Sequence, residues 1–214
     1  MPATTLPGFK NAVHEAQRTF KSLLEALSHP AQPYSPNVNI TPPAGLTPLC
    51  AAACLTLIDL ETVVWLQPSL STDVQNWLRF HTGCRFTQDP NSATFAVIET
   101  FSSEITLQGF NWGSAEQPEQ STTLLIQVKD IGSNEAVGSP KIASPKVLSG
   151  PGILGKISFV PTLPETFWAQ WPQNNAAYPR GLDCFLFTSD SVVGLPRTTY
   201  LHPSPSFTPC PTSL

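Results

Sequence analysis

Residues 178–199 read Tyr-Pro-Arg-Gly-Leu-Asp-Cys-Phe-Leu-Phe-Thr-Ser-Asp-Ser-Val-Val-Gly-Leu-Pro-Arg-Thr-Thr, and they contain two short apolar runs. The first run, 182–187, is interrupted only by an aspartate and a cysteine, and the second run, 192–195, stops at a proline. Ser-Asp-Ser lies between them, and these residues favour a tight polar turn. The pattern therefore predicts a β-hairpin.

Each end of this hairpin carries an arginine beside a proline, Arg180 at the start and Arg197 at the end. Proline fixes its own φ angle, so it stiffens the backbone next to each arginine. We therefore expect two guanidinium groups near the edges of the hairpin, with the hydroxyl groups of Thr198 and Thr199 beside one of them. Two interpretations remain open, an anion-binding site and a pair of ordinary surface salt bridges.

The composition points to a globular chain whose surface is unusually poor in charge. Hydrophobic residues make up 41% of the sequence, but charged residues make up only 12%, about half the usual ~25%. Few charges together with 23 prolines suggest that a partner, rather than water, covers part of the surface. The net charge of −4 and the absence of a basic block argue against nucleic acid and anionic membranes as partners.

The length and the termini suggest one cytoplasmic domain. A chain of 214 residues can bury a sizeable core, and no apolar run approaches the ~20 residues of a membrane span. The first seven residues, Met-Pro-Ala-Thr-Thr-Leu-Pro, lack the basic and apolar regions of a signal peptide. We therefore expect the five cysteines to be free thiols in a reducing compartment.

Four helices are predicted from apolar spacing and from their ends. The segments are 9–28, 48–60, 71–82 and 165–171, and the second has Thr47 as N-cap before a proline at the first helical position. The second segment is apolar nearly all round, so a buried helix is expected there. The first can close the core or dock on a partner, because its apolar residues form one stripe: Phe9, Val13, Ala16, Phe20, Leu23, Leu24 and Leu27.

Strands are predicted between these helices, at 62–66, 94–98, 122–128 and 157–160, where β-branched and aromatic residues gather. Alternating helices and strands predict an α/β fold, with one domain built on a mixed sheet that helices flank. The segment 129–146 is polar and is expected to be mobile. The domain is expected to span 1–201, with a proline-rich tail over 202–214.

Two spacings resemble known ligand motifs. Gly150-Pro-Gly-Ile-Leu-Gly155 matches G-x-G-x-x-G, but Pro151 removes a backbone N–H from the loop, and no long helix follows. A tight turn whose glycines adopt positive φ is the favoured interpretation. Cys50 and Cys54 lie four residues apart in a predicted helix, yet no further ligand accompanies them, so we expect small core residues and no metal site.

His81 and Lys156 are the remaining candidates for chemistry. His81, near a predicted helix end, is suited to general acid–base catalysis, but no acidic partner is apparent, and a structural role is favoured. Lys156 is suited to Schiff-base chemistry with an aldehyde cofactor, although nothing around it marks it as more than an exposed lysine. The residues alone provide no complete catalytic set.

Eight segments in chain order carry a family resemblance. They are Gln17–Leu24 with Pro30, Val64–Leu66, Leu78–Thr82, Ala93–Val97, Thr123–Val128, Leu148–Ile153, Tyr178–Asp183 and Leu195–Thr199. Together they resemble the PhnH family, a subunit of the bacterial carbon–phosphorus lyase system for phosphonate use. One departure is Ala31, which follows His29-Pro30 where the family usually has a glycine.

The resemblance implies a subunit role. PhnH-like proteins associate with PhnG, PhnI and PhnJ, and PhnH alone is regarded as a homodimer without activity of its own. The first committed step of the pathway displaces adenine from ATP by a phosphonate and gives a ribose 1-phosphonate 5-triphosphate. The family fold is similar to a reduced type I pyridoxal-phosphate transferase that lacks the cofactor lysine, so no cofactor is expected.

Two hypotheses follow for the function. In the first, the chain is a non-catalytic assembly or positioning subunit, inactive alone, and no catalytic residue is assigned. In the second, it is a self-contained nucleotide- or phosphonate-binding protein that uses Arg180 and Arg197. The further candidate ligand-binding residues in that case are Thr198, Thr199 and His81.

Overall fold

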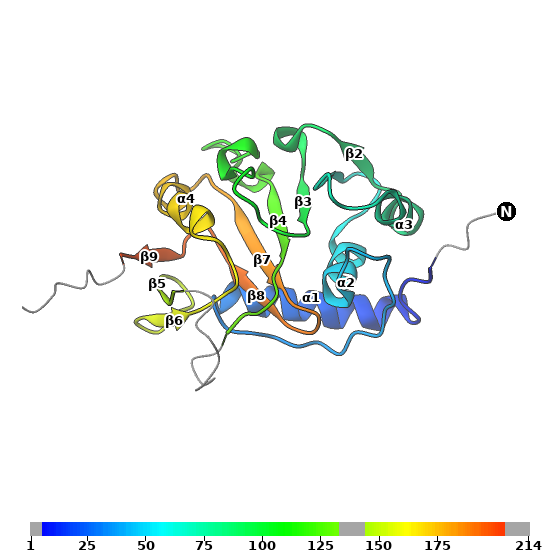
Figure 1. Cartoon of the computed structure of the whole chain (residues 1–214), viewed down its shortest axis with the longest axis horizontal. Helices are drawn as coiled ribbons and strands as arrows, with labels where there is room; N and C mark the ends of the chain where they lie inside the picture. Colours follow the sequence, from blue (N-terminus) through cyan, green and yellow to red (C-terminus); the bar gives the residue numbers. More distant parts are fainter. Residues whose placement is uncertain (1–5, 133–143, 204–214) are drawn as a thin grey trace, which may run out of the picture.

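The computed structural model describes residues 6–132 and 144–203, and its centre is a six-stranded sheet with spatial order β2-β1-β3-β4-β7-β8 (Figure 1). The first five strands in that order run parallel, and β8 runs antiparallel to β7. The strands are β1 (Val63–Leu66), β2 (Arg85–Thr87), β3 (Phe95–Ile98), β4 (Thr123–Gln127), β7 (Asp183–Phe187) and β8 (Val192–Leu195). The predicted hairpin is confirmed as β7 and β8.

A smaller antiparallel sheet of order β6-β5-β9 stands apart from the central one. Its strands are β5 (Lys146–Ser149), β6 (Ile157–Phe159) and β9 (Tyr200–His202). Only β6 was predicted, because β5 and β9 lie in stretches rich in lysine, serine or proline. The proposed tail, 202–214, thus begins inside β9, and its residues from 204 onward lie outside the described part of the chain.

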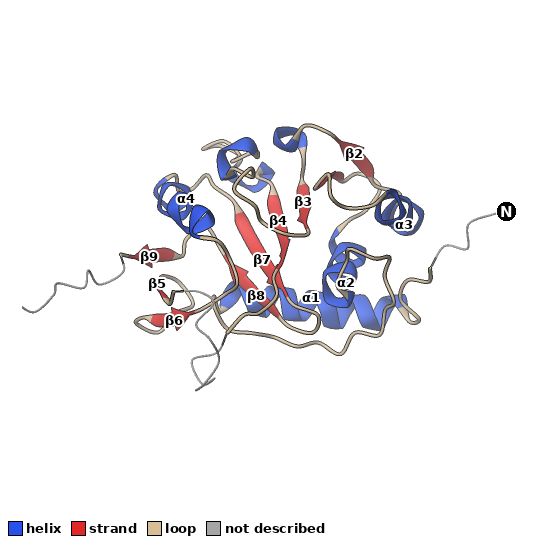
Figure 2. Cartoon of the chain, viewed as in Figure 1, coloured by secondary structure: helices blue, strands red, loops and turns tan. Residues whose placement is uncertain are grey.

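Helices cover both faces of the central sheet (Figure 2). They are α1 (Ala12–Ser28), α2 (Pro48–Leu57), α3 (Thr72–Thr82) and α4 (Glu165–Ala176), with short 3-10 turns at Pro90–Ser92, Leu107–Gly109 and Pro118–Gln120. The first three helices pack into one core cluster and α4 into another. None of the helices within residues 6–132 and 144–203 is both long enough and apolar enough to cross a membrane.

The central strands are apolar on both sides because each side has its own core. In β4, Leu124 and Ile126 belong to the cluster that includes α4, whereas Leu125 belongs to the cluster that includes the other three helices. A parallel sheet buried on both faces requires such near-continuous apolar runs. The predicted class, a single α/β domain with a mixed sheet flanked by helices, is therefore confirmed.

The predicted stripe of α1 is divided between the core and the surface. Leu23 lies in the core, but Val13, Phe20 and Leu24 keep 75%, 52% and 56% of their surface exposed. The buried residues of α1 are Thr19, Leu23 and Ala26, and at Ala26 the helix lies very close to β8. A Cβ added at Gly194 of β8 would overlap the backbone carbonyl of Ala26.

Two local predictions need correction. Helix α4 does not stop at residue 171 but continues through Pro172 to Ala176, because buried Trp171 and Asn174 anchor its last turns. Helix α2 ends at Leu57 rather than at residue 60, because Ile58 adopts an extended conformation. The polar stretch 129–146 is only partly described, and its residues 133–143 lie outside the described ranges.

Candidate functional site

The hairpin arginine Arg197 forms a network that joins three segments. Its Nη2 lies 2.6 Å from Oδ2 of Asp183, its Nε lies 3.2 Å from both carboxylate oxygens, and its backbone N–H donates to Oδ1 at 2.8 Å. Nη2 also donates to the Ser121 hydroxyl at 2.7 Å, and Nη1 donates to the carbonyls of Pro118 and Pro179. The guanidinium therefore fastens the start of β7 to the loops on either side.

This network uses all the donors that an arginine has. Five N–H groups are available on a guanidinium, and the five acceptors around Arg197 match that number. The side chains of Arg197 and Asp183 are only 12% and 24% exposed. A phosphate could reach this guanidinium only by displacing an internal partner, so the geometry favours a structural ion pair. One interpretation of the sequence was a surface salt bridge, but the ion pair between Arg197 and Asp183 is partly buried.

The other predicted site residues are not gathered around Arg197. Thr198 shares with it a shallow depression of about 330 Å³, but Arg180 is exposed and does not line this depression. Thr199 is buried, its carbonyl accepts from the Trp171 indole at 2.9 Å, and its hydroxyl has no hydrogen-bond partner within the described residues. Whether Arg180 and Arg197 bind a ligand stays a prediction.

His81 lies at the C-terminal end of α3, in a different part of the fold. Its Nε2 is 3.0 Å from the carbonyl oxygen of Leu6, and its ring packs edge-on against Trp77. Trp77 donates to the same carbonyl at 2.8 Å. His81 thus helps to hold the N-terminal segment against α3, and no carboxylate among the described residues pairs with it.

The G-x-G-x-x-G segment is a packing turn. Gly150, Gly152 and Gly155 all have positive φ, as predicted. A Cβ at Gly152 would overlap the carbonyl oxygen of Ser28 at the end of α1, and one at Gly150 would approach the Thr198 carbonyl oxygen to 2.8 Å. The glycines therefore let the turn touch α1 and the segment after β8.

The four described cysteines are buried in the core, as was predicted for Cys50 and Cys54. Cys50, Cys54, Cys84 and Cys184 are buried free thiols, and Cys210 lies outside the described ranges. The hydrogen bond with Cys54, together with burial, raises the pKa of the Cys50 thiol well above its ordinary value. No cluster of potential metal ligands occurs within the part of the chain that the structure describes.

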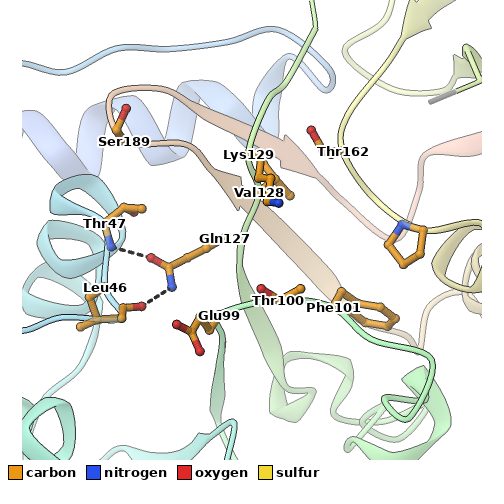
Figure 3. A pocket seen from close by; sticks show the side chains of 12 residues that line it. Leu46, Thr47, Glu99, Thr100, Phe101, Gln127, Val128, Lys129, Thr162 and Ser189 are labelled. Carbon is orange, nitrogen blue, oxygen red and sulfur yellow. Dashed lines mark hydrogen bonds between the residues drawn. The ribbon is translucent and has the colours of Figure 1, made fainter. Parts of the chain in front are cut away.

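A pocket of the size that small molecules occupy lies elsewhere in the described structure, at the carboxyl ends of the parallel strands (Figure 3). It has a volume of about 670 Å³ and is lined by residues at or after the ends of β3, β4 and β7 and by the segments before α2 and α4. Ligands of open parallel sheets bind at this edge, close to the point where the strand order reverses, which here lies between β1 and β3. The pocket lies at this edge but over β3, β4 and β7, beside the reversal point, since no residue that follows β1 lines it.

Gln127, the last residue of β4, shapes one wall of this pocket. The residue is 8% exposed, its side-chain oxygen accepts from the Thr47 backbone N–H, and its side-chain nitrogen donates to the Gly45 carbonyl at 2.7 Å. Thr47 in turn caps α2, since its hydroxyl accepts from the Cys50 N–H at 3.4 Å. One buried amide thus positions the N-terminus of α2 against the sheet.

A second amide, Gln67, joins the ends of β1 and β3 across the reversal point. Its oxygen accepts from the backbone N–H groups of Glu99 and Thr100 at 2.9 and 3.1 Å, and its nitrogen donates to the Thr100 carbonyl at 3.0 Å. The Glu99 carboxylate accepts from Ser69 at 2.8 Å and faces the pocket together with exposed Lys129. The lining thus holds one carboxylate and one ammonium group.

The pocket residues supply polar and charged groups that suit ligand binding. Their described lining contains hydroxyl groups, Glu99 and Lys129, and it contains no histidine or cysteine that could act as nucleophile or base. Sequence reasoning missed this site, although Glu99 and Lys129 directly follow predicted strands. The signal that could have found it is the position of polar residues after the carboxyl ends of neighbouring parallel strands.

Comparison with known proteins identifies the family. A family model described as "Bacterial phosphonate metabolism protein (PhnH)" matches residues 7–202. The Rhizobium meliloti protein named "Alpha-D-ribose 1-methylphosphonate 5-triphosphate synthase subunit PhnH" is 35% identical over 196 residues, covering 91% of this chain and 94% of that protein. HtxG of Stutzerimonas stutzeri, by its description a candidate C–P lyase subunit, is 33% identical over 42% of each chain. Matches over this length show that the chain belongs to the PhnH family of bacterial phosphonate metabolism proteins.

Proposed function

We propose that this chain is a non-catalytic or positioning subunit of the carbon–phosphorus lyase core complex. In this role it supports formation of α-D-ribose 1-phosphonate 5-triphosphate from ATP and an alkylphosphonate. The observation that carries the proposal is the 35% identity to a named synthase subunit over 94% of that subunit's length.

The geometry supports a role in assembly rather than independent catalysis. The pocket at the carboxyl ends of the strands has no histidine or cysteine among its described lining residues, and the Arg197 donors are all engaged within the fold. A surface with only 12% charged residues and 23 prolines suits a chain that is largely covered by partners. These observations favour the subunit hypothesis over a self-contained ligand-binding protein that uses Arg180 and Arg197.

The finer parts of the proposal come from the family resemblance. The partners are PhnG, PhnI and PhnJ, the free chain is a homodimer, and the complex works in the cytoplasm. The domain of residues 1–201 is a reduced relative of the type I pyridoxal-phosphate transferases. A parallel sheet with one antiparallel edge strand supports this last relationship.

Co-purification tests the proposal directly. The tagged full-length chain is co-expressed with PhnG, PhnI and PhnJ, and the eluate is weighed by native mass spectrometry. A stoichiometric assembly containing all four proteins is expected. A monomer or homodimer that elutes without partners, and that binds ATP or a phosphonate, would instead support the self-contained binding protein.

A further inference from the structure

The pocket at the carboxyl ends of β3, β4 and β7 carries two opposite charges that do not neutralise each other. Glu99 follows β3 and Lys129 follows β4, and the ladder pairs Ile98 with Ile126, so both charged residues leave the sheet at the same edge. No ion pair joins them, and Figure 3 shows the two side chains apart. Each charge is therefore available to a ligand group of opposite sign.

The Glu99 carboxylate is fixed in place, and one of its oxygens stays free. The backbone N–H of Glu99 donates to the side-chain oxygen of Gln67 at 2.9 Å, and its Oε2 accepts from the Ser69 hydroxyl at 2.8 Å. Its Oε1 accepts no hydrogen bond from the residues that the structure describes, and a Cβ added at Gly45 would lie 3.6 Å from this oxygen. A carboxylate held in this way loses little conformational entropy when it accepts a further hydrogen bond.

The pocket also presents donors that the fold leaves unused. Lys129 is exposed, and its ammonium group forms no ion pair or hydrogen bond with any residue in 6–132 or 144–203. The hydroxyl groups of Thr100 and Ser189 line the same pocket, and neither has a hydrogen-bond partner within those two ranges. An ammonium group and hydroxyl groups suit an oxyanion with several acceptor oxygens.

Apolar side chains complete the lining. They are Leu46, Phe101, Val128 and Pro164, and the first three are almost fully buried. The lining thus combines an acceptor for a cation, donors for an oxyanion and apolar surface for a short carbon chain. A few placed polar groups in a largely apolar pocket are typical of sites that fix the orientation of a small ligand.

We infer that this pocket binds an aminoalkylphosphonate, a zwitterion with a phosphonate at one end of a short alkyl chain and an amine at the other. Glu99 accepts from the ammonium group of the ligand, and Lys129 pairs with its phosphonate. The inference rests on the proposed function, because the phosphonate class comes from it, and it names the substrate that this positioning subunit holds. The ligand is bound and oriented here, and no bond of it is made or broken.

Other ligands use these groups less well. A nucleoside triphosphate would bring several negative charges beside Glu99, and Lys129 is the one cation in the described lining. An alkylphosphonate without an amine leaves the fixed Glu99 carboxylate without a partner, which lowers its affinity relative to the zwitterion. An amino acid has the same pattern of charges but a planar carboxylate, so the test compares the two anions directly.

Isothermal titration calorimetry of the purified full-length chain tests the inference. The ligands are 2-aminoethylphosphonate, ethylphosphonate, β-alanine and ATP, and the variants are Glu99→Gln and Lys129→Met. Matched controls are Glu61→Gln and Lys156→Met, which change exposed residues that do not line the pocket. The same titrations are repeated on the assembly co-purified with PhnG, PhnI and PhnJ.

We expect the wild type to bind 2-aminoethylphosphonate roughly tenfold more tightly than ethylphosphonate. Glu99→Gln should abolish this preference and leave the affinity for ethylphosphonate unchanged, because only the amine contacts Glu99. Lys129→Met should weaken both phosphonates by about the same factor, roughly tenfold, and both controls should bind as the wild type does. Glutamine can still accept from Ser69, and Lys129 is exposed, so both variants should unfold at the wild-type urea concentration.

Several results would overturn the inference. A preference for 2-aminoethylphosphonate that survives Glu99→Gln would place the amine elsewhere. Equal affinity for β-alanine would make the pocket an amino-acid site, and tighter, competitive binding of ATP would make it a nucleotide site. A stoichiometric assembly in which neither the free chain nor the complex binds a phosphonate would reject this site and leave the proposed function intact. Binding that depends on Glu99, by a chain that joins no assembly, would support the site and reject the subunit role.

Discussion

Replacing Arg197 by alanine tests whether this arginine stabilises the fold or binds a ligand. The substitution removes the partner of a carboxylate, Asp183, whose side chain is 24% exposed. It also leaves the Ser121 hydroxyl and the carbonyls of Pro118 and Pro179 without their donor. The folded state therefore keeps a partly buried charge and several acceptors that Arg197 no longer satisfies.

The size of the effect follows from this arrangement. Breaking a buried ion pair by removing one partner costs roughly 3–5 kcal/mol, and the partial exposure of Asp183 argues for the lower end, about 3 kcal/mol. In a chain of this length each kcal/mol lowers the melting temperature by ~2–4 °C, so a decrease of roughly 6–12 °C is expected. Arg197→Lys keeps the charge but loses the planar fork, and we expect an intermediate loss.

Urea unfolding followed by tryptophan fluorescence measures the change, provided that the slope of the transition stays constant. Arg180→Ala is the matched control, because that arginine is exposed and its side chain forms no hydrogen bond among the described residues. Its stability should change by less than ~0.5 kcal/mol. An Arg197→Ala protein within ~1 kcal/mol of wild type that had lost affinity for ATP or a phosphonate would refute the structural role.

Four further outcomes are expected. Gly152→Ala should destabilise the chain by more than ~3 kcal/mol in urea unfolding, because its methyl group would overlap the Ser28 carbonyl at a positive φ; wild-type stability would contradict the close packing. Gln127→Leu should cost about 1–3 kcal/mol, because two backbone groups before α2 lose a buried partner, and hydrogen exchange should speed up there first. Burial raises the pKa of the Cys184 thiol, so iodoacetamide at pH 8 should label it only after unfolding, as peptide mass spectrometry would reveal. The Thr62 hydroxyl and the Glu61 N–H lower the pKa of Asp59, so its stabilising effect is present above ~pH 4 and is lost as the pH falls further. Asp59→Asn should therefore flatten the dependence of unfolding free energy on pH in that range.

Ala31 stands in the turn after α1, at a position where a glycine was expected. The family resemblance led us to expect a glycine there, and Ala31 has a φ of 64°, in the left-handed region that glycine adopts without a steric penalty. Its N–H donates to the Gly194 carbonyl at 3.3 Å, so the turn after α1 keeps its connection to β8. The chain tolerates alanine at a position whose backbone geometry favours glycine.

For the candidate sites, the sequence predicted where polar groups occur along the chain but not how they are paired. It placed Arg197 at the end of a hairpin, yet Asp183 became its partner only because β7 and β8 bring residues 14 positions apart together. It located Glu99 and Lys129 after strands, but the pocket between them depends on the strand order of the sheet. A single sequence does not specify strand order, because hydrophobic patterns are alike in every buried strand.

The sequence by itself determined the α/β class, the hairpin, the buried helix α2 with its Thr47 cap, and the positive φ angles of the glycine turn. These features depend on local hydrophobic periodicity, on capping residues and on backbone freedom, all of which act within a few positions of the chain. Only the tertiary structure decided which face of α1 is buried, that α4 continues through Pro172, and that β5 and β9 form a second sheet. Those outcomes depend on contacts between segments far apart in sequence, and such contacts override local preference wherever burial stabilises the fold more than propensity does.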